Sequence, residues 1–472
     1  MPEKFRVEKD TLGERKVPAA CYYGIQTARA KENFPVSGLK AKPVFIKATA
    51  LVKIASCRAN MRLGLLDRKR GVAIEKAASE VSSGSLHNEF IVDVYQAGAG
   101  TSHNMNANEV IANRAIEILG GKKGDYSIVH PNDHVNMSQS TNDTMPAALR
   151  VAVLLSFPSL LDSFKNLAAS LAAKSREFDP IIKSGRTHLQ DAVPVTLGQE
   201  FGSYASSIKS SIKNMTASLE GVRRIGLGAT AVGTGINTHP TYRDVVLKEL
   251  SKASGLKLVK AADTFEALNS MADFTAFSSS LKNTAVELIR IANDLRLLSS
   301  GPRTGLAEIR LPALQPGSSI MPGKVNPVMA EMLNMVSFQV IGNDLTVSTA
   351  AAAGQLELNV MLPVINYNLL QSIELLTNAV NVFTEKCVKG IEADKARCRE
   401  YFEKSAGLAT ILNSFIGYSK AAEVARDSVK TGRTIKEIVL ERGLLSENEW
   451  TRLMEPKAIT GPMDLKRLKK KA

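Results

Sequence analysis

Long apolar runs are missing from this chain of 472 residues. No stretch of about 18 apolar residues occurs, so the sequence predicts no transmembrane helix. The apolar stretch Val151–Leu161 contains Pro158 and is followed by Asp162. The first ten residues are charged and lack the apolar core of a secretory signal. We therefore expect a cytoplasmic protein with no membrane partner.

Cysteine and aromatic residues are also scarce. Four cysteines without a CxxC pair do not make a disulfide framework in so long a chain, so we expect reduced thiols. Aromatic residues amount to 5%, which leaves few side chains to stack on bases. Although the net charge is +14, we therefore expect no nucleic-acid partner. The basic cluster at Lys466–Lys471 is interpreted as a solvated tail.

What the sequence does contain is helical periodicity, together with plentiful Ala and Leu. The apolar period dominates four long segments: Val151–Phe178, Leu197–Arg224, Ala261–Ser300 and Pro327–Cys387. Helices this long must pack side by side, so the pattern predicts an all-α fold with a central long-helix bundle. Their apolar positions cover more than one face, which predicts burial against other copies in a homo-oligomer.

Three domains are expected along the chain. A mixed, mainly helical N-terminal domain should cover 1–140, and the long-helix bundle should cover 141–393. A small domain of shorter helices should cover 394–472, with glycine turns between its helices.

Two weak motifs receive structural interpretations. Gly226–Ala231 fits a GxGxxA dinucleotide fingerprint, but an amphipathic helix precedes it where that motif needs a strand. We interpret it as a glycine-rich connection between helices. His130 and His134 are four residues apart, but the proline-containing segment between them indicates a turn. We therefore expect no nucleotide cofactor and no metal site.

Four polar loops are the most informative feature of the sequence. They are GAGTSHNMN at Gly98–Asn106, QSTND at Gln139–Asp143, GRTHLQDA at Gly185–Ala192 and GSSIMPGKVNP at Gly317–Pro327. Any one of them could simply cap a helix and have no other role, because Ser, Thr and Asn are the usual N-cap residues. Together they supply neutral hydrogen-bond donors, a cation at Lys324 and a proton acceptor at His188. That combination suits a small dianion whose charge must be held while a carbon–hydrogen bond breaks.

The loop Gly317–Pro327 is the most specific of the four. Its glycines would let it move as a lid, and backbone N–H groups exposed there can bind an oxyanion. Lys324 and Asn326 lie just before Pro327, where a helix could begin. A helix N-terminus favours a carboxylate, so this loop is predicted to bind one.

GSSIMPGKVNP resembles the signature of the fumarase/aspartase superfamily. The resemblance extends from LGERKVPAACYYGIQTARAKENF near the start to TGRTIKEIVLERGLL near the end. Members of that superfamily are homotetramers of three helical domains, with a twenty-helix core and active sites built from three subunits. The resemblance therefore implies composite sites in a homotetramer, a small dicarboxylate substrate and no organic cofactor.

Within the superfamily, VDVYQAGAGTS, LQDAVPVTLGQEF and AGQLELNVM resemble the aspartases, which split L-aspartate into fumarate and ammonia. A class II fumarate hydratase is the alternative. A catalytically idle structural protein is a third hypothesis, against which the intact serine loop argues.

The resemblance also implies residue roles. Ser318 would be the general base that removes the Cβ proton. The β-carboxylate, which becomes an aci-carboxylate dianion, would be held by Thr101, Ser140, Thr141 and Ser319. The α-carboxylate would be bound by Lys324, Asn326 and Thr187. The amino group would be surrounded by Asn142, Thr187 and His188.

Some positions depart from the family pattern. Leu362 stands where relatives usually carry a charged residue, and Ser414 stands where proline is common. His130, Asn132 and Asp133 resemble a peripheral dicarboxylate site of fumarases, and the sequence predicts no role for it here.

Overall fold

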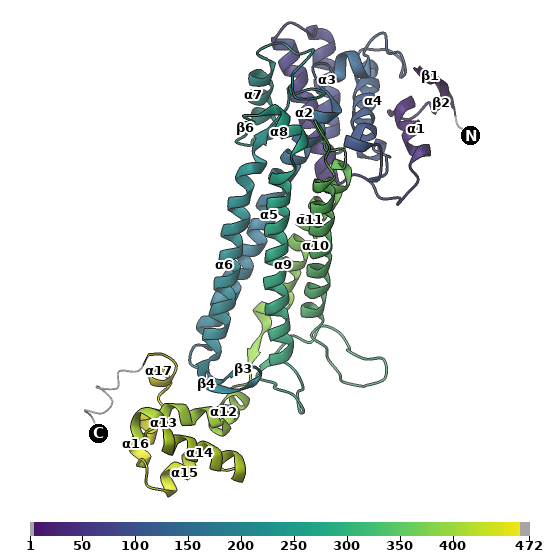
Figure 1. The fold of residues 1–472 in the computed structure, drawn as a ribbon. Coiled ribbons are helices and arrows are strands. Elements are labelled where there is room, and N and C mark those ends of the chain that lie inside the picture. The colour runs from purple at the N-terminus through teal and green to yellow at the C-terminus, as the bar shows by residue number, and fades with distance from the viewer. Residues whose placement is uncertain (1–3, 463–472) are drawn as a thin grey trace. The chain divides into compact units, whose positions relative to one another are not determined.

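The computed structural model describes residues 4–462, and most of these residues are helical (Figure 1). The prediction of an all-α protein is confirmed, and the few strands form two-stranded pairs. The strands are β1 (Phe5–Asp10), β2 (Gly13–Pro18), β3 (Ile182–Thr187), β4 (Gln190–Thr196), β5 (Arg224–Ile225), β6 (Val259–Lys260), β7 (Ile309–Arg310) and β8 (Glu392–Ala393). The predicted basic tail at Lys466–Lys471 lies outside the described residues.

The longest helices all lie before residue 387. The helices up to residue 386 are α1 (Ile25–Asn33), α2 (Pro43–Arg62), α3 (Arg68–Ser82), α4 (Thr101–Ile118), α5 (Thr141–Phe178), α6 (Leu197–Val222), α7 (Tyr242–Ser254), α8 (Thr264–Asn269), α9 (Ala272–Leu298), α10 (Val328–Ala352) and α11 (Leu362–Lys386). The helices that follow are α12 (Lys395–Lys404), α13 (Ala409–Ile416), α14 (Tyr418–Thr431), α15 (Ile435–Glu441), α16 (Glu447–Leu453) and α17 (Pro456–Ile459).

The long helices follow the predicted segments, with three corrections. The segment Ala261–Ser300 contains two helices, α8 and α9, separated at Ser270–Met271. The expected loop at Gln139–Asp143 is helical from Thr141, where α5 begins, and that helix includes both Pro146 and Pro158. Its polar first turn resembled a loop in the sequence. The segment Pro327–Cys387 is also not one helical stretch, because α10 and α11 are separated at Ala353–Met361. A left-handed residue, Leu356 with φ 50°, turns the chain there.

Helix α5 is long and apolar enough to cross a membrane by length and composition alone. In its most apolar window, however, 72% of the residues are buried inside the structure. Leu149, Val153 and Leu160 have no exposed surface. Packing within the protein therefore accounts for the apolar character of this helix. The four cysteines are free thiols, as predicted.

The chain divides into two compact units whose boundaries fall inside the long helices. Unit 1 consists of the residues up to Leu161, Lys213–Ala285 and Phe338–Thr377. Unit 2 consists of Asp162–Ile212, Val286–Ser337 and the residues from Asn378 onward.

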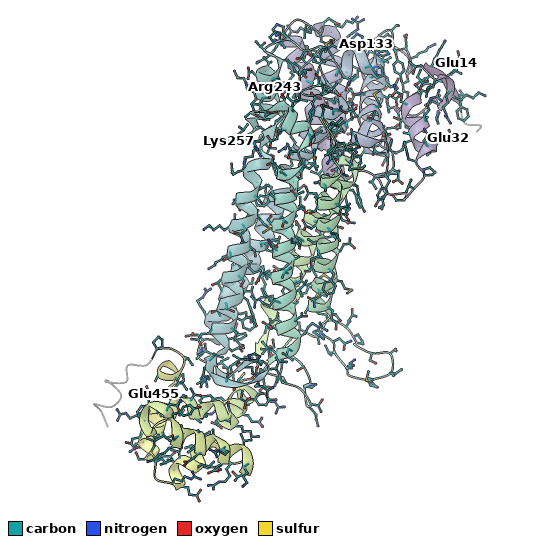
Figure 2. The ribbon with its side chains drawn as sticks, viewed as in Figure 1. Glu14, Glu32, Asp133, Arg243, Lys257 and Glu455 are labelled. Carbon is teal, nitrogen blue, oxygen red and sulfur yellow. The ribbon has the colours of Figure 1, made fainter. Side chains whose placement is uncertain are left out.

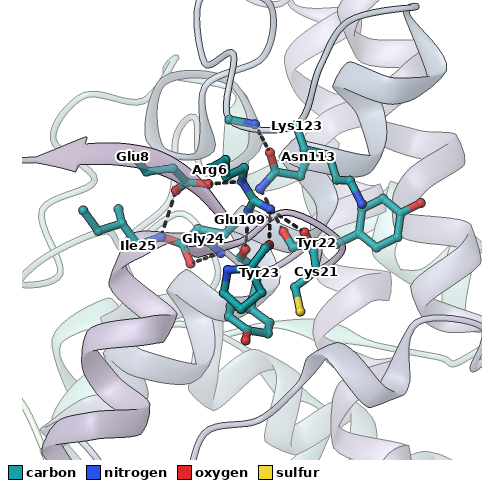
Figure 3. A network of polar contacts seen from close by, with 12 residues as sticks. Arg6, Glu8, Cys21, Tyr22, Tyr23, Gly24, Ile25, Glu109, Asn113 and Lys123 are labelled. Carbon is teal, nitrogen blue, oxygen red and sulfur yellow. Dashed lines mark hydrogen bonds and ion pairs between the residues drawn. The ribbon is translucent and has the colours of Figure 1, made fainter. Parts of the chain in front are cut away.

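In unit 1, a buried carboxylate anchors the N-terminal elements (Figure 3). Glu109 on α4 accepts hydrogen bonds from the backbone N–H groups of Gly24, Gln26 and Thr27 at 2.8–3.1 Å. It also accepts a hydrogen bond from the Thr27 hydroxyl at 2.6 Å. These N–H groups begin α1 and have no partner within that helix. Glu109 therefore ties α1 to α4, and burial raises its pKa to about 7.

In unit 2, a buried charge cluster holds the hairpin β3–β4. Lys183 on β3 contacts the carboxylates of Glu200 at 2.9 Å and Glu308 at 2.6 Å. Arg186 on the same strand donates to Glu308 at 2.8 Å. Glu308 has no exposed surface, so it fixes two cations of one strand. The hairpin is thereby anchored close to its tip.

The C-terminal helices of unit 2 form a hydrophobic core of their own. It includes Leu412, Ile435 and Trp450. Capping boxes begin α15 at Thr434 and α16 at Ser446. The prediction of shorter helices after Asp394 is confirmed.

Candidate active site

The first polar loop enters α4 through two left-handed residues. Ala99 has φ 59° and Gly100 has φ 90°. A non-glycine residue in this region costs about 1–3 kcal/mol and persists only where its surroundings hold it. Here the Ala99 N–H donates to the carbonyl of Val360 at 2.8 Å. Thr101 is the exposed first residue of α4, beside N–H groups that favour an anion.

The second polar loop is held by Asp143, which is 1% exposed. One carboxylate oxygen accepts the backbone N–H of Ser140 at 3.0 Å. The other accepts the N–H groups of Gly228 and Thr230, both at 2.9 Å. Burial raises the pKa of Asp143 to about 6, and these hydrogen bonds oppose the rise. Asp143 therefore fixes Ser140 and the start of α5 against a segment far away in the sequence.

That distant segment is the glycine-rich stretch Gly226–Ala231. It lies between α6 and α7, so its interpretation as a connection between helices is confirmed, although the two-residue strand β5 and not a helix directly precedes it. Its role in holding the site was missed, and only its density of glycine could have suggested it. Asn142 Nδ2 donates to the Ala231 carbonyl at 2.8 Å. Because only the amino group can donate to a carbonyl, Asn142 Oδ1 is left as an acceptor on the opposite side.

Unit 1 brings the first two loops together. Asn104 in the first turn of α4 donates through Nδ2 to Thr141 Oγ1 at 3.0 Å. Ser140 Oγ accepts the backbone N–H of Asn142 at 3.2 Å. The N-terminal ends of α4 and α5 therefore meet, and both ends favour negative charge.

The third polar loop is the tip of the hairpin β3–β4 in unit 2. Thr187 and His188 are exposed there. His188 and Leu189 are both left-handed, with φ 55° and 58°. The strained turn presents the imidazole on a short hairpin that Arg186 anchors to Glu308.

The fourth polar loop is closed at its base. The Gly317 N–H donates to the Lys324 carbonyl at 2.6 Å, and Asn326 Nδ2 donates to the Gly317 carbonyl at 2.8 Å. A side chain at Gly317 would place its Cβ 2.7 Å from the Lys324 carbonyl oxygen, so glycine is required. Ser319 and Lys324 are exposed, and α10 begins at Val328, next to the predicted Pro327.

Within this loop, two backbone amides converge on one hydroxyl. Ser318 Oγ accepts the N–H of Ile320 at 3.2 Å and that of Met321 at 3.0 Å. Donors directed at a hydroxyl oxygen stabilise negative charge on it. This arrangement would favour ionisation of the serine.

The ten predicted site residues therefore form separate groups. Unit 1 holds Thr101, Ser140, Thr141 and Asn142, and unit 2 holds Thr187, His188, Ser318, Ser319, Lys324 and Asn326. In the part of unit 2 that the structure describes, no hydrogen bond joins the third loop to the fourth.

The His130 turn lines a cleft of about 470 Å³ in unit 1, together with Asn132 and Arg29. Residues Pro131–Val135 form a single π-helical turn. His130 Nδ1 accepts the N–H groups of Asn132 and Asp133, both at 3.2 Å. The Asp133 side chain is 75% exposed at the surface (Figure 2). Among the residues that the structure describes, no cluster of three His, Cys, Asp or Glu could hold a metal.

Comparison with known protein families shows which family this chain belongs to. The profile of the family described as Lyase matches residues 13–342. The profile described as Fumarase C C-terminus matches residues 408–461. The chain belongs to the fumarase/aspartase superfamily of lyases.

The chain is also similar to individual aspartate ammonia-lyases in sequence and to solved structures of fumarate lyases and fumarases. The aspartate ammonia-lyase of Bacillus subtilis (strain 168) is 51% identical over 460 residues, covering 98% of this chain and 97% of the relative. That of Escherichia coli (strain K12) is 48% identical, covering 95% of each chain. Among solved structures, a fumarate lyase:delta crystallin from Brucella melitensis bound to cobalt has a TM-score of 0.95 and 48% identity, covering 97% of this chain and 100% of that one. A class II fumarase from Schistosoma mansoni has a TM-score of 0.94 and 37% identity, with the same coverage.

Proposed function

We propose that this chain is an aspartate ammonia-lyase, a carbon–nitrogen lyase that converts L-aspartate into fumarate and ammonia. The relatives of that name cover nearly the whole chain at about half identity. The observation that carries the proposal is the Ser318 turn, in which two amides converge on a hydroxyl in the same loop as Lys324.

The first step is proton transfer from Cβ. Ionised Ser318 takes the proton, and the electron pair of the C–H bond moves into the β-carboxylate. A free serine is far too weak a base for this step. The N–H groups of Ile320 and Met321 would lower that barrier by stabilising the alkoxide, and the Lys324 side chain of the same loop is proposed to add positive charge.

The second step is loss of ammonia. The electron pair returns from the aci-carboxylate to form the carbon–carbon double bond, and the carbon–nitrogen bond breaks. Hydroxyls are proposed to hold the dianion between the steps, namely those of Thr101, Ser140, Thr141 and Ser319. The α-carboxylate is proposed to be bound by Lys324, Asn326 and Thr187.

The amino group is proposed to lie near Asn142, Thr187 and His188. Asn142 supports this assignment because its Nδ2 is used by the Ala231 carbonyl. Its free oxygen can accept a hydrogen bond from an ammonium group. This polarity favours an amine over a carboxylate at that position.

We also propose that the enzyme is a homotetramer with active sites composed from three subunits. The separation of the ten residues between two units is consistent with sites completed by other copies. Helix α10 supports assembly because it exposes an apolar stripe at Met335, Phe338 and Leu345, with exposed fractions of 64%, 57% and 69%. Stripes of this kind on long helices pack against other helices.

Three domains, at 1–140, 141–393 and 394–472, remain our proposed division of the subunit. The start of α5 at Thr141 and the separate core around Trp450 support it.

A single assay tests the proposed activity. The purified protein is given L-aspartate or L-malate, and fumarate is followed by its ultraviolet absorbance. Fumarate from aspartate is the expected result. Fumarate from malate alone would indicate a fumarate hydratase, and fumarate from neither would indicate an idle protein.

A further inference from the structure

A fully buried lysine lies behind the second polar loop of unit 1. Lys53 on α2 has no exposed surface. Its ammonium donates to Asn136 Oδ1 at 2.9 Å and to Gln139 Oε1 at 3.0 Å. Both acceptors are neutral amides, so the charge is not neutralised where it binds. A charge in this position is costly to bury, which calls for a reason.

The lysine sets the orientation of the amides that follow it. Lys53 donates to the Asn136 side chain, so the Asn136 atom that faces Lys53 is its oxygen. Asn104 lies with its terminal amide 3.2 Å from that same oxygen and must therefore present Nδ2 to it. The same Nδ2 lies 3.0 Å from Thr141 Oγ1 and donates its second hydrogen there. The hydrogen bond from Lys53 therefore fixes which atom of Asn136 accepts, which atom of Asn104 donates, and that the Thr141 hydroxyl oxygen accepts.

Thr141 is left as a donor. Its oxygen accepts a hydrogen bond from Asn104, so its own hydrogen can be donated to a group outside this hydrogen-bond network. Thr141 is also the first residue of α5, beside N–H groups that favour negative charge. A hydroxyl held in this way can stabilise an oxyanion without first reorienting.

We propose that Asn104, oriented by Lys53 through Asn136, is a positioning residue that presents the Thr141 hydroxyl as a donor to the aci-carboxylate dianion. This inference depends on the proposed aspartate ammonia-lyase activity. Asn104 itself does not contact the substrate in this scheme, and its effect passes entirely through Thr141.

Helix α4 offers a matched control. Asn108 lies one turn beyond Asn104, is equally buried, and donates to the same Asn136 oxygen at 3.2 Å. Its other hydrogen-bond acceptor is Met105 Sδ at 3.4 Å, not Thr141. The variants Asn104→Leu and Asn108→Leu therefore remove the same kind of donor from the same acceptor. Only the first also removes the contact with Thr141.

The two variants are measured with L-aspartate in the wild-type and Thr141→Val backgrounds. In the wild-type background, Asn104→Leu should lower kcat by about tenfold or more, with KM changed by no more than about threefold. In the Thr141→Val background, the same change should lower kcat by less than about twofold, because the two residues act as one unit. Asn108→Leu should change kcat by less than about threefold, and equally in both backgrounds.

Equal losses from Asn104→Leu in both backgrounds would overturn the inference. An Asn108→Leu loss as large as that of Asn104→Leu would overturn it as well. If the leucine variant does not fold, Asn104→Asp replaces it, since the two side chains have the same shape. A carboxylate only accepts, so it would draw the Thr141 hydrogen inward and lower kcat. An unchanged kcat in Asn104→Asp would also contradict the proposal.

The two levels of hypothesis are separated by the wild-type protein. If it forms no fumarate from aspartate, the proposed function fails, and the inference fails with it. If it is active and the losses are additive, the inference alone fails.

Discussion

At the scale of single residues, local composition revealed the loops but not what holds them. Hydroxyls, amides and glycines gather within a few positions, so the four polar loops could be predicted from the sequence, and the resemblance to the superfamily then implied Ser318 and Thr141 as site residues. Lys53 and Thr230 could not, because they reach the site through tertiary contacts that leave no local pattern. Asp143 was included in a predicted loop, but its burial was not foreseen.

Removal of the Ser318 hydroxyl tests the general base. Ser318→Ala should lower kcat by at least about 10²–10⁴-fold, since that is what a positioned general base contributes. The side chain belongs to a surface loop, so the melting temperature should stay unchanged. Fumarate formation and thermal unfolding are measured on the same preparation. Turnover close to that of the wild type would contradict the assigned role.

Lys53 should make the free energy of unfolding depend on pH. Burial lowers the pKa of Lys53 to about 7, although the Asp143 carboxylate opposes this change. Burial and the charge of Lys53 lower the pKa of His103 to about 3. Between about pH 7 and 10.5, the unfolded chain therefore binds more protons at this residue, and its contribution to stability rises with pH. The upper limit of this rise is about 5 kcal/mol.

The variant Lys53→Met lacks this contribution. Relative to the variant, the wild type should gain stability as the pH rises from about 7 to 10, in urea unfolding at several pH values. Thr49→Val on the same helix is the control, because it removes a buried hydroxyl without changing a charge. The difference between Lys53→Met and wild type staying constant over that range would contradict the assignment.

At the scale of elements, apolar periodicity predicted the long helices because their buried faces repeat regularly. The boundaries were harder to predict. The polar first turn of α5 contains Thr141, Asn142 and Asp143, which are used by tertiary contacts and by capping. The break between α10 and α11 was missed because Ala-rich sequence continues the helical pattern up to it. The strain at Leu356 has no counterpart in hydrophobic spacing.

The hairpin β3–β4 is predicted to depend on one carboxylate. Glu308→Gln leaves Arg186 without its carboxylate and Lys183 with Glu200 alone. Breaking a buried ion pair on one side should destabilise the protein by about 3 kcal/mol. KM should rise as well, because Thr187 and His188 lie at the tip of this hairpin.

Thermal unfolding and steady-state kinetics measure both effects. Glu400→Gln on α12 is the control, since its side chain is 40% exposed and pairs with the half-buried Arg397 and the exposed Lys404. That variant should leave the melting temperature unchanged. A stable Glu308→Gln protein with wild-type KM would show that the cluster does not position the hairpin.

At the scale of the whole molecule, the exposed stripe on α10 leads to a prediction about assembly. Leu345→Glu would place a charge in the proposed helix–helix interface of the proposed tetramer, which is costly without a partner. We expect smaller species in light scattering coupled to size exclusion, together with loss of turnover. Val429→Glu on α14 changes an equally exposed apolar residue away from the long helices and should remain tetrameric. An intact Leu345→Glu tetramer would contradict the proposed interface.

The closed base of the Gly317–Pro327 loop makes two side chains of the segment it encloses replaceable. Gly317 and Asn326 fasten the two ends of this segment to each other, and α10 begins only after them. The exposed side chains of Ile320 and Met321 can therefore be exchanged without disturbing the helix that follows, because only their backbone N–H groups contact Ser318. The contacts that the loop makes at its tip could be changed in this way while both ties, Ser318 and Lys324 are retained.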